Sequence, residues 1–116
     1  MEIIGFENRI VEEQSWGSLT WYASKALGGS QSVTVGKCVI KPGEQNPRHT
    51  HPNCDEILHV LEGVIIHTYA DEQMKMEKGD TIVVPSGIAH NAVNIGETDA
   101  ELSIAFSSGE RKTVGE

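Results

Sequence analysis

Residues 43–63 read GEQNPRHTHPNCDEILHVLEG, so that two histidines, His49 and His51, lie between two glycines. A second segment, residues 79–94, reads GDTIVVPSGIAHNAVN and carries His90. Side chains alternate between the two faces of a β-strand, so His49 and His51 point to the same side and can hold one ion together. The two segments therefore predict a cluster of imidazoles contributed by separate strands.

Glu56 is a carboxylate that follows the two histidines in the first segment. It lies five residues after His51, an odd offset that would put it on the opposite face of a straight strand. The residues between them, Pro-Asn-Cys-Asp, are typical of a turn. We expect this turn to reset the register, so that Glu56 points toward the histidines.

Both segments match, position for position, the paired signature of the cupin superfamily, including the glycines and the proline that frame the histidines. The chain resembles a small single-domain cupin over residues 32–107. The resemblance implies an all-β fold, a cupin-type double-stranded β-helix or jelly-roll barrel. It also implies that one divalent transition metal (Fe, Mn, Ni, Cu or Zn, which suit these ligands) is held by the histidine–glutamate cluster, which comprises His49, His51, Glu56 and His90.

The rest of the sequence reads as short β-rich runs separated by Gly, Pro, Asn and Asp, the pattern of a sandwich or barrel. We expect strands at residues 19–23, 32–40, 56–61, 64–70, 73–77, 80–84, 89–94 and 101–107. Residues 1–31 are expected to form an N-terminal arm that adds an outer strand or crosses to a partner subunit. Residues 32–107 would form the barrel, and residues 108–116 a polar tail at the surface. Small barrels often hide a free sheet edge by pairing, so we expect a homodimer.

Composition narrows the partners and the compartment. The 116 residues carry a formal net charge of −8, which argues against nucleic acid, because that interaction depends on Lys and Arg neutralising phosphates. The opening residues lack a basic start followed by a long apolar run, and no stretch is apolar enough to span a bilayer. Cys38 and Cys54 are isolated thiols and not a disulfide framework. We therefore expect a cytoplasmic protein without a membrane partner.

Several residues near the motifs have a structural interpretation. His59 and His67 lie outside the ligand register and are expected to be surface or hydrogen-bonded core residues. Cys38 is expected to act as a small core hydrophobe. In the thiol dioxygenases of this superfamily a cysteine stands where this chain keeps Glu56, whereas Cys54 comes two residues earlier. We therefore expect Cys54 to be a turn thiol near the rim, without a role in the chemistry.

Other positions are expected to shape the site without binding the metal. Arg48 has the opposite parity to His49 and should point to the outer face of its strand. In the superfamily that this chain resembles, Asn94 reads as a turn or hydrogen-bonding position. The large aromatics available to pack the core or to line a pocket are Trp16, Trp21, Tyr22, Tyr69 and Phe106.

The functional expectation follows from the resemblance. Cupins include dioxygenases, oxalate-degrading enzymes, sugar isomerases, lyases and ligand-sensing modules, and the fold alone does not choose among them. The resemblance favours a metal-dependent enzyme, dioxygenase-like or isomerase/lyase-like, in which the ion acts as Lewis acid and template for a small oxygenated molecule such as an enol, diketone or uronate. Glu56 would be a ligand only, or would move away to act as acid or base. The alternative is a non-catalytic module that binds a metal and a small ligand.

Overall fold

The computed structural model describes residues 2–116 and is built almost entirely of β-strands. Within these residues a short 3-10 helix, η1 (Phe6–Asn8), precedes eleven strands. The strands are β1 (Ile10–Gln14), β2 (Gly17–Ala23), β3 (Thr34–Ile40), β4 (His49–Thr50), β5 (Glu56–Glu62), β6 (Val64–Tyr69), β7 (Glu72–Glu77), β8 (Thr81–Val84), β9 (His90–Asn94), β10 (Ala100–Phe106) and β11 (Val114–Gly115). Across residues 2–116, no helix combines the length and the apolar character that crossing a bilayer requires.

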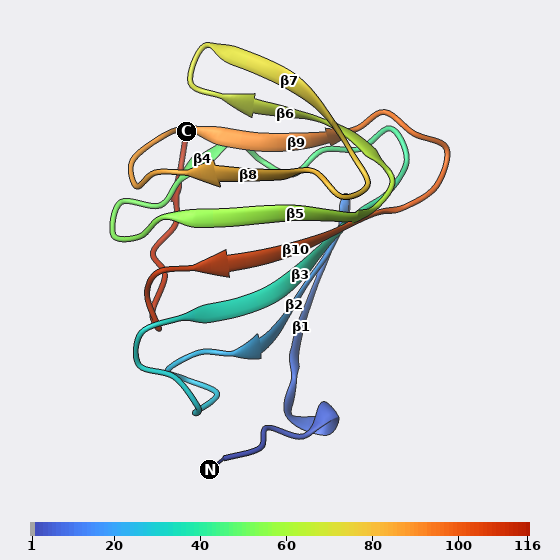
Figure 1. The fold of residues 1–116 in the computed structure, drawn as a ribbon. Helices are drawn as coiled ribbons and strands as arrows, with labels where there is room; N and C mark the ends of the chain where they lie inside the picture. The colour runs from blue at the N-terminus through green and yellow to red at the C-terminus, as the bar shows by residue number, and fades with distance from the viewer. Residues whose placement is uncertain (1) are drawn as a thin grey trace.

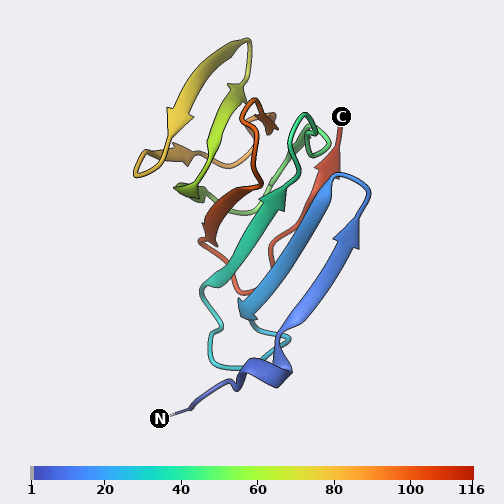
Figure 2. The same ribbon diagram turned by 90° about the vertical axis from the view of Figure 1, so that its right-hand side faces the viewer.

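The strands form two antiparallel sheets, which Figures 1 and 2 show from two sides. The larger sheet has six strands in the order β1-β2-β3-β10-β5-β8, and the smaller has five in the order β11-β4-β9-β6-β7. Strands that are adjacent in a sheet are often distant in sequence, as in a double-sheet jelly roll. The expectation of an all-β fold is confirmed.

The core lies between the two sheets and follows from alternation along the strands. In β3 and β10 every second residue is buried. Ile40 and Leu102 of the larger sheet and Ile65 of the smaller are fully buried in one cluster. Burying a side chain of this size stabilises the fold by roughly 1.5–3 kcal/mol. Apolar contacts between the sheets therefore supply the rigid frame that carries the site.

The turn before β5 resets the register as the sequence predicts. Asp55 fixes this turn, because its carboxylate accepts a hydrogen bond from Ser86 N at 3.0 Å and its amide donates to Ser107 Oγ at 2.9 Å. Glu56 then begins β5 on the inward face, in line with the buried Leu58. The carboxylate consequently enters the space between the sheets.

Gly63 shows why the first segment ends on glycine. It occupies the β5–β6 hairpin with φ of 96°, a conformation that side chains disfavour. A Cβ at this position would also lie 2.9 Å from Ala100 Cα. The hairpin therefore needs glycine both for its backbone angle and for its contact with β10.

Each of the eight expected strands has a counterpart in the structure. The strands outside the expected ranges are β1, β4 and β11. In the N-terminal arm, β1 pairs with β2 as an outer strand of the larger sheet. Residues 112–116 are exposed, as a polar tail would be, but Gly109 is buried and Arg111 is half-buried, and the chain end forms β11, which pairs with β4 and sets Gly115 opposite His49. Backbone pairing needs no apolar pattern, which is why this polar strand left no signal in the sequence.

Candidate metal centre

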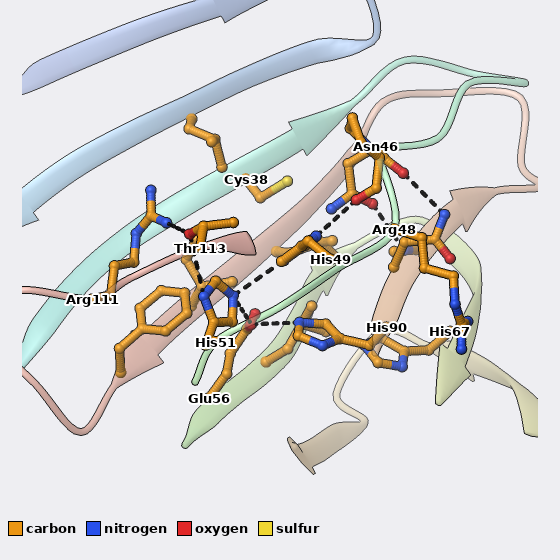
Figure 3. Close-up of a pocket in the computed structure, with 18 of the residues that line it drawn as sticks. Cys38, Asn46, Arg48, His49, His51, Glu56, His67, His90, Arg111 and Thr113 are labelled. Carbon is orange, nitrogen blue, oxygen red and sulfur yellow. Dashed lines mark hydrogen bonds and ion pairs between the residues drawn. The ribbon is translucent and has the colours of Figure 1, made fainter. Parts of the chain in front are cut away.

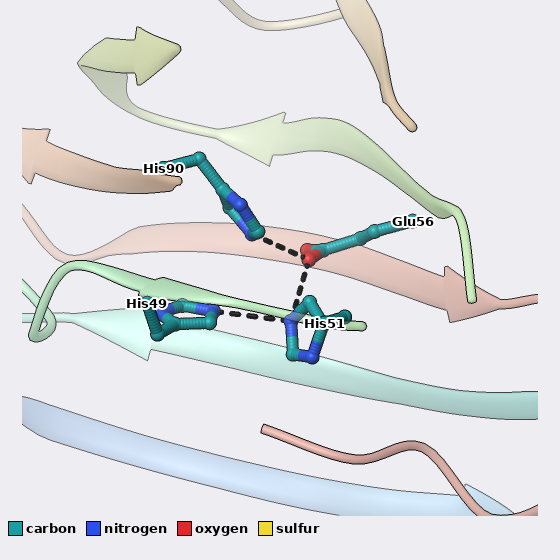
Figure 4. A group of neighbouring side chains, drawn as sticks. All are labelled: His49, His51, Glu56 and His90. Carbon is teal, nitrogen blue, oxygen red and sulfur yellow. Dashed lines mark hydrogen bonds and ion pairs between the residues drawn. The ribbon is translucent and has the colours of Figure 1, made fainter. Parts of the chain in front are cut away.

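The four residues of the histidine–glutamate cluster converge between the two sheets (Figure 4). His49 of β4 and His90 of β9 are direct cross-strand partners in the smaller sheet. His51 follows β4 immediately, and Glu56 enters from β5 of the larger sheet. One ligand atom from each residue lies within 4.8 Å of all the others. Residues that are up to 41 positions apart in sequence (90 − 49) therefore form one compact group.

Backbone carbonyls fix the orientation of all three imidazole rings. In each ring Nδ1 faces a carbonyl oxygen: His49 faces Pro47 O at 2.7 Å, His51 faces Lys112 O at 2.9 Å, and His90 faces Ile88 O at 2.8 Å. A carbonyl oxygen can only accept a hydrogen bond, so Nδ1 carries the proton in each ring. In the neutral ring, Nε2 then keeps its lone pair, as a metal-ligating histidine requires.

The ligand atoms lie at hydrogen-bonding distances from one another that neutral rings with the proton on Nδ1 cannot account for. Nε2 of His49 lies 3.1 Å from Nε2 of His51. Oε1 of Glu56 lies 2.9 Å from Nε2 of His90 and 3.2 Å from Nε2 of His51. With Nδ1 protonated, lone pairs would face lone pairs unless extra protons or a cation lay between them. Ligands about 2.1 Å from a metal and at right angles to each other are about 3 Å apart, so the donor set fits one divalent ion.

The charges within the cluster are strongly coupled. Burial would raise the pKa of the Glu56 carboxyl, but hydrogen bonds from His51 and His90 outweigh it and hold the pKa at about 2. Burial would lower the pKa of His90, yet its hydrogen bond to Glu56 and the charge of that carboxylate raise it overall. Burial dominates at His49 and lowers its pKa to about 4. Glu56 therefore stays ionised at neutral pH, which suits a ligand better than a proton donor.

The cluster opens into a cavity of about 360 Å³ (Figure 3). Its apolar wall comes mainly from β2, β3, β5 and β10 of the larger sheet, with Trp16 from the turn before β2. The residues of this apolar wall are Trp16, Leu19, Trp21, Cys38, Leu58, Leu102, Ile104 and Phe106. Arg111 and Thr113 also line the cavity, from the C-terminal segment. Sequence reasoning missed these two residues, because nothing in the polar segment indicates that it folds back over the site.

His67 is the cavity residue that departs most from expectation. It lies on β6, is fully buried, and stacks on His90 with ring centroids 5.8 Å apart and planes 10° apart. Neither of its nitrogens has a hydrogen-bond partner among the described residues. The expectation of a surface or hydrogen-bonded core residue is therefore wrong for His67. Burial, with a smaller contribution from His90, lowers its pKa to about 4, so the ring is neutral. By contrast, His59 faces Thr81 Oγ1 at 2.7 Å, away from the cluster.

Both cysteines are free and buried. Cys38 packs in the core as expected, and burial raises its pKa to about 12. Cys54 follows the turn before β5, packs against the same core and is only 4% exposed, so it is a buried thiol. Burial raises its pKa as well, and the Glu56 charge adds to the effect. Neither group is a thiolate at neutral pH, and neither belongs to the cluster.

The expectation for Asn94 is confirmed, whereas that for Arg48 holds only in part. Asn94 is buried, and its amide group donates to Ile40 O and Thr98 O, both at 2.8 Å. Arg48 donates to Thr68 Oγ1 at 2.7 Å, but it also lines the cavity beside the cluster (Figure 3), so it does not simply point away from the site. Because the neighbouring His67 points inward, Thr68 and the guanidinium of Arg48 lie on the outer side of the smaller sheet.

Comparison with known proteins agrees with this geometry. Residues 36–106 match the family model described as "Cupin domain". The chain is 33% identical over 81 residues to a germin-like protein of Morus alba, covering 66% of this chain and 39% of the relative. It is 36% identical over 81 residues to auxin-binding protein ABP19b of Prunus persica, covering 66% of this chain and 39% of that protein. It is 31% identical over 96 residues to oxalate oxidase 1 of Hordeum vulgare, covering 76% of this chain and 46% of that protein. The chain thus spans less than half the length of these curated relatives.

Solved structures show the same fold at lower identity. An oxalate oxidase in complex with glycolate superposes with a TM-score of 0.79 at 24% identity, covering 88% of this chain and 56% of the other. The oxalate decarboxylase of Bacillus subtilis, whose Mn(II) centres have been characterised, superposes with a TM-score of 0.84 at 21% identity, covering 90% of this chain and 29% of the other. These matches confirm the expected cupin-type jelly roll.

The expected cytoplasmic setting is contradicted by these relatives. It rested on two isolated cysteines and on the opening residues of the chain. Germin-like proteins and oxalate oxidases are typically extracellular. The physical reason is that a jelly roll with its own apolar core does not depend on disulfides, so unpaired thiols do not report the compartment.

Proposed function

Because this chain belongs to the cupin family, we propose that it holds one divalent transition metal in the histidine–glutamate cluster and acts there as an enzyme on a small oxygenated acid. The observation that carries the proposal is the convergence of three histidine Nε2 atoms and one carboxylate oxygen, each ring being fixed through Nδ1. The names of similar proteins, an oxalate oxidase and an oxalate decarboxylase, support an acid as the substrate.

The chain's own residues have separable tasks in this proposal. The three histidines donate neutral Nε2 atoms, and Glu56 offsets one unit of the ion's positive charge. Bound at this position, a divalent metal supplies a Lewis acid that can bind and polarise a substrate oxygen. The apolar wall displaces water from around the bound acid, which strengthens polar contacts inside the cavity. Glu56 acts as a ligand, since two histidines hold its carboxylate oxygen.

Metal content is the first measurement. Protein purified without a tag should contain close to one equivalent of a divalent transition metal, or take it up when offered Mn(II), Fe(II), Zn(II), Ni(II) or Cu(II). Mn(II) is the first choice, because a similar decarboxylase contains it. Protein that binds none of these ions at stoichiometric amounts under any of the loading conditions would refute the proposal.

The reaction type then follows from the need for oxygen. Loaded protein would be assayed with oxalate, glycolate, and small enediols and diketones, both in air and without oxygen. Oxygen uptake coupled to substrate loss supports a dioxygenase-like or oxidase-like reaction. Turnover that persists without oxygen supports a lyase-like or isomerase-like reaction. The same assay on His51→Ala, which lacks one ligand, measures the background.

A non-catalytic binding module is the second candidate. The similarity to auxin-binding protein ABP19b favours it, because that relative is named for binding a ligand and not for a reaction. In that case a ligand would bind the loaded protein with metal dependence and would be recovered unchanged, both in air and without oxygen.

We also propose a homodimer formed through the N-terminal arm. β1 is one of the two edge strands of the larger sheet, and Ile3 and Phe6 beside it are 85% and 75% exposed. Unpaired edges and exposed apolar side chains both favour association. Size-exclusion chromatography with light scattering should report twice the monomer mass for the full chain. A monomer at high protein concentration would contradict this.

A further inference from the structure

Arg111 stands out because it places a cation on the wall of an otherwise apolar part of the cavity. Its guanidinium lies over the ring of Trp21, 4.1 Å from the centroid, and 5.3 Å from that of Phe106. Nη1 donates to Thr113 Oγ1 at 2.5 Å. Stacking on aromatic rings fixes the plane of a guanidinium and leaves its edge donors free to bind a ligand.

No carboxylate of the described residues pairs with Arg111. No ion pair joins it to an acidic oxygen within 4.0 Å, although five other Lys or Arg side chains make such pairs or hydrogen bonds. Burial lowers the pKa of Arg111 overall, although among the acidic residues Glu12 raises it most. The Glu12 carboxylate is not paired with Arg111, however, and accepts a hydrogen bond from Trp21 Nε1 at 2.7 Å. A half-buried arginine without a partner is costly, so an anion bound in the cavity would satisfy it.

Arg111 lies close to the histidine–glutamate cluster. Thr113, which accepts its hydrogen bond, also lies 3.3 Å from Nδ1 of His51 through the same Oγ1 atom. Figure 3 shows Arg111, Thr113 and His51 as a continuous chain of contacts along one side of the cavity. A single small molecule can therefore reach both the guanidinium and the metal position.

The apolar wall is too large for a two-carbon acid alone. The cavity of about 360 Å³ falls in the range of about 300–1,000 Å³ that is typical of sites for drug-sized ligands. Eight of its residues form the continuous apolar wall. A ligand that fills this space needs an apolar body in addition to its polar end.

We propose that the occupant is a carboxylic acid with an apolar, ring-sized body. Its carboxylate pairs with Arg111, a neighbouring oxygen binds at the metal position, and its body lies on the apolar wall. This inference rests on the proposed metal site and names the substrate class of that site. It distinguishes this chain from a protein whose cavity accepts only oxalate or glycolate.

Three matched probes test the proposal on metal-loaded full-length protein by isothermal titration calorimetry. Mandelate carries a carboxylate, a neighbouring hydroxyl and a phenyl ring. Glycolate has the same polar end without the ring, and mandelamide keeps the ring but is neutral. Mandelate should bind at least tenfold more tightly than either of the others. Equal affinities for mandelate and glycolate would overturn the apolar body, and equal affinities for mandelate and mandelamide would overturn the anion site.

Variants of Arg111 provide the second arm. Arg111→Gln should weaken mandelate binding at least tenfold while mandelamide binding and metal content stay the same, and Arg111→Lys should recover part of the loss. The matched control is Arg9→Gln, because Arg9 also stacks on an aromatic ring, Phe6 at 3.7 Å, but lies outside the cavity. Unchanged mandelate affinity in folded Arg111→Gln would refute the role of Arg111.

The two proposals fail in different ways. If the protein binds no metal but mandelate still binds and depends on Arg111, the metal function is wrong and the anion site stands. If one equivalent of metal is bound and mandelate binding does not depend on Arg111, the metal function stands and the present inference is wrong. The comparison of probes in the unmodified protein holds even if an Arg111 variant fails to fold.

Discussion

The histidine–glutamate cluster and the apolar wall line the same cavity but draw on different parts of the chain. The cluster comes from two short segments, and two of its rings are fixed by carbonyls only two residues away, Pro47 for His49 and Ile88 for His90. The apolar wall and Arg111 come from β2, β3, β5, β10 and the C-terminal segment. His51 joins the two regions, because its carbonyl partner, Lys112, is 61 residues away. Local motifs thus build the histidine–glutamate cluster, whereas the apolar wall of the cavity depends on the whole fold.

Removing a cluster histidine should have the largest effect. His51→Ala and His90→Ala should each fall from one bound metal equivalent to nearly none, because removing one of four ligands takes away both a donor and the geometry of the site. Both variants should stay folded, since the core between the sheets does not depend on these rings. Elemental analysis and circular dichroism measure the two properties.

His59→Ala is the matched control, because His59 contacts Thr81 outside the cluster. It should keep its full metal equivalent. Retention of metal by both His51→Ala and His90→Ala would mean that the convergence of these rings does not reflect metal binding.

Metal affinity should also fall strongly as the pH is lowered. In the metal-free protein, burial would lower the pKa of His90, but Glu56 raises it above the ordinary value overall. A metal must therefore displace a proton from His90 at and somewhat above pH 6.5, whereas His49, with its pKa lowered to about 4, needs no such displacement. Affinity should decline as pH falls from about 8 to about 5.5. Competition with a chromophoric chelator across this range measures it, and a flat profile would contradict the coupling of His90 to Glu56.

A change at the junction of the two regions should have an intermediate effect. Asn53 fastens the C-terminal segment, since its Oδ1 accepts from Lys112 N and its Nδ2 donates to Glu110 O, both at 2.8 Å. Asn53→Ala should loosen Lys112, whose carbonyl orients His51. Metal binding should weaken about tenfold, since losing a hydrogen-bond partner of a metal-binding histidine typically costs about 10- to 100-fold in affinity. Mandelate affinity should fall in the same variant, because Arg111 lies in the same segment.

Asp80→Ala is a suitable control, since the Asp80 carboxylate fixes the turn between β7 and β8 by accepting a hydrogen bond from Glu77 N at 2.8 Å, and neither residue lines the cavity. If Asn53→Ala weakened neither metal nor mandelate binding, the C-terminal segment would not be what orients His51.

The same difference explains how much the sequence predicted. His49 lies on β4, His51 follows this strand directly, and Glu56 comes after a recognisable turn, so their convergence could be predicted from spacing and from the cupin resemblance. Arg111 and Thr113 could not be predicted, because their place in the cavity depends on β11 pairing with β4 through backbone groups that carry no sequence pattern. The expectation for His67 is wrong because alternation along a strand predicts which face a side chain lies on, but not whether a buried ring has a hydrogen-bond partner.

His67 allows the smallest and sharpest test, since it lies against His90 yet belongs to neither the metal ligands nor the apolar wall. Its two nitrogens are buried without a hydrogen-bond partner in residues 2–116, and an unsatisfied buried polar group costs about 1–3 kcal/mol. Leucine has a similar volume and no polar atoms, so His67→Leu should raise the free energy of unfolding by about 1 kcal/mol after some loss from imperfect shape. Chemical denaturation of the metal-free protein at pH 7 measures this.

Measuring the free energy of unfolding of the unmodified protein and of His67→Leu at several pH values separates the effect of polarity from that of packing. The pKa of His67 is lowered to about 4 in the folded chain, whereas the unfolded chain takes up that proton near pH 6.5. Protonation therefore favours the unfolded state as pH falls from about 6.5 toward about 4, and stability is lost in that window. His67→Leu removes this contribution, so its advantage over the unmodified protein should grow on acidification. An advantage that stayed constant with pH would mean that leucine stabilises the fold by packing alone, and that the ring of His67 is satisfied in solution.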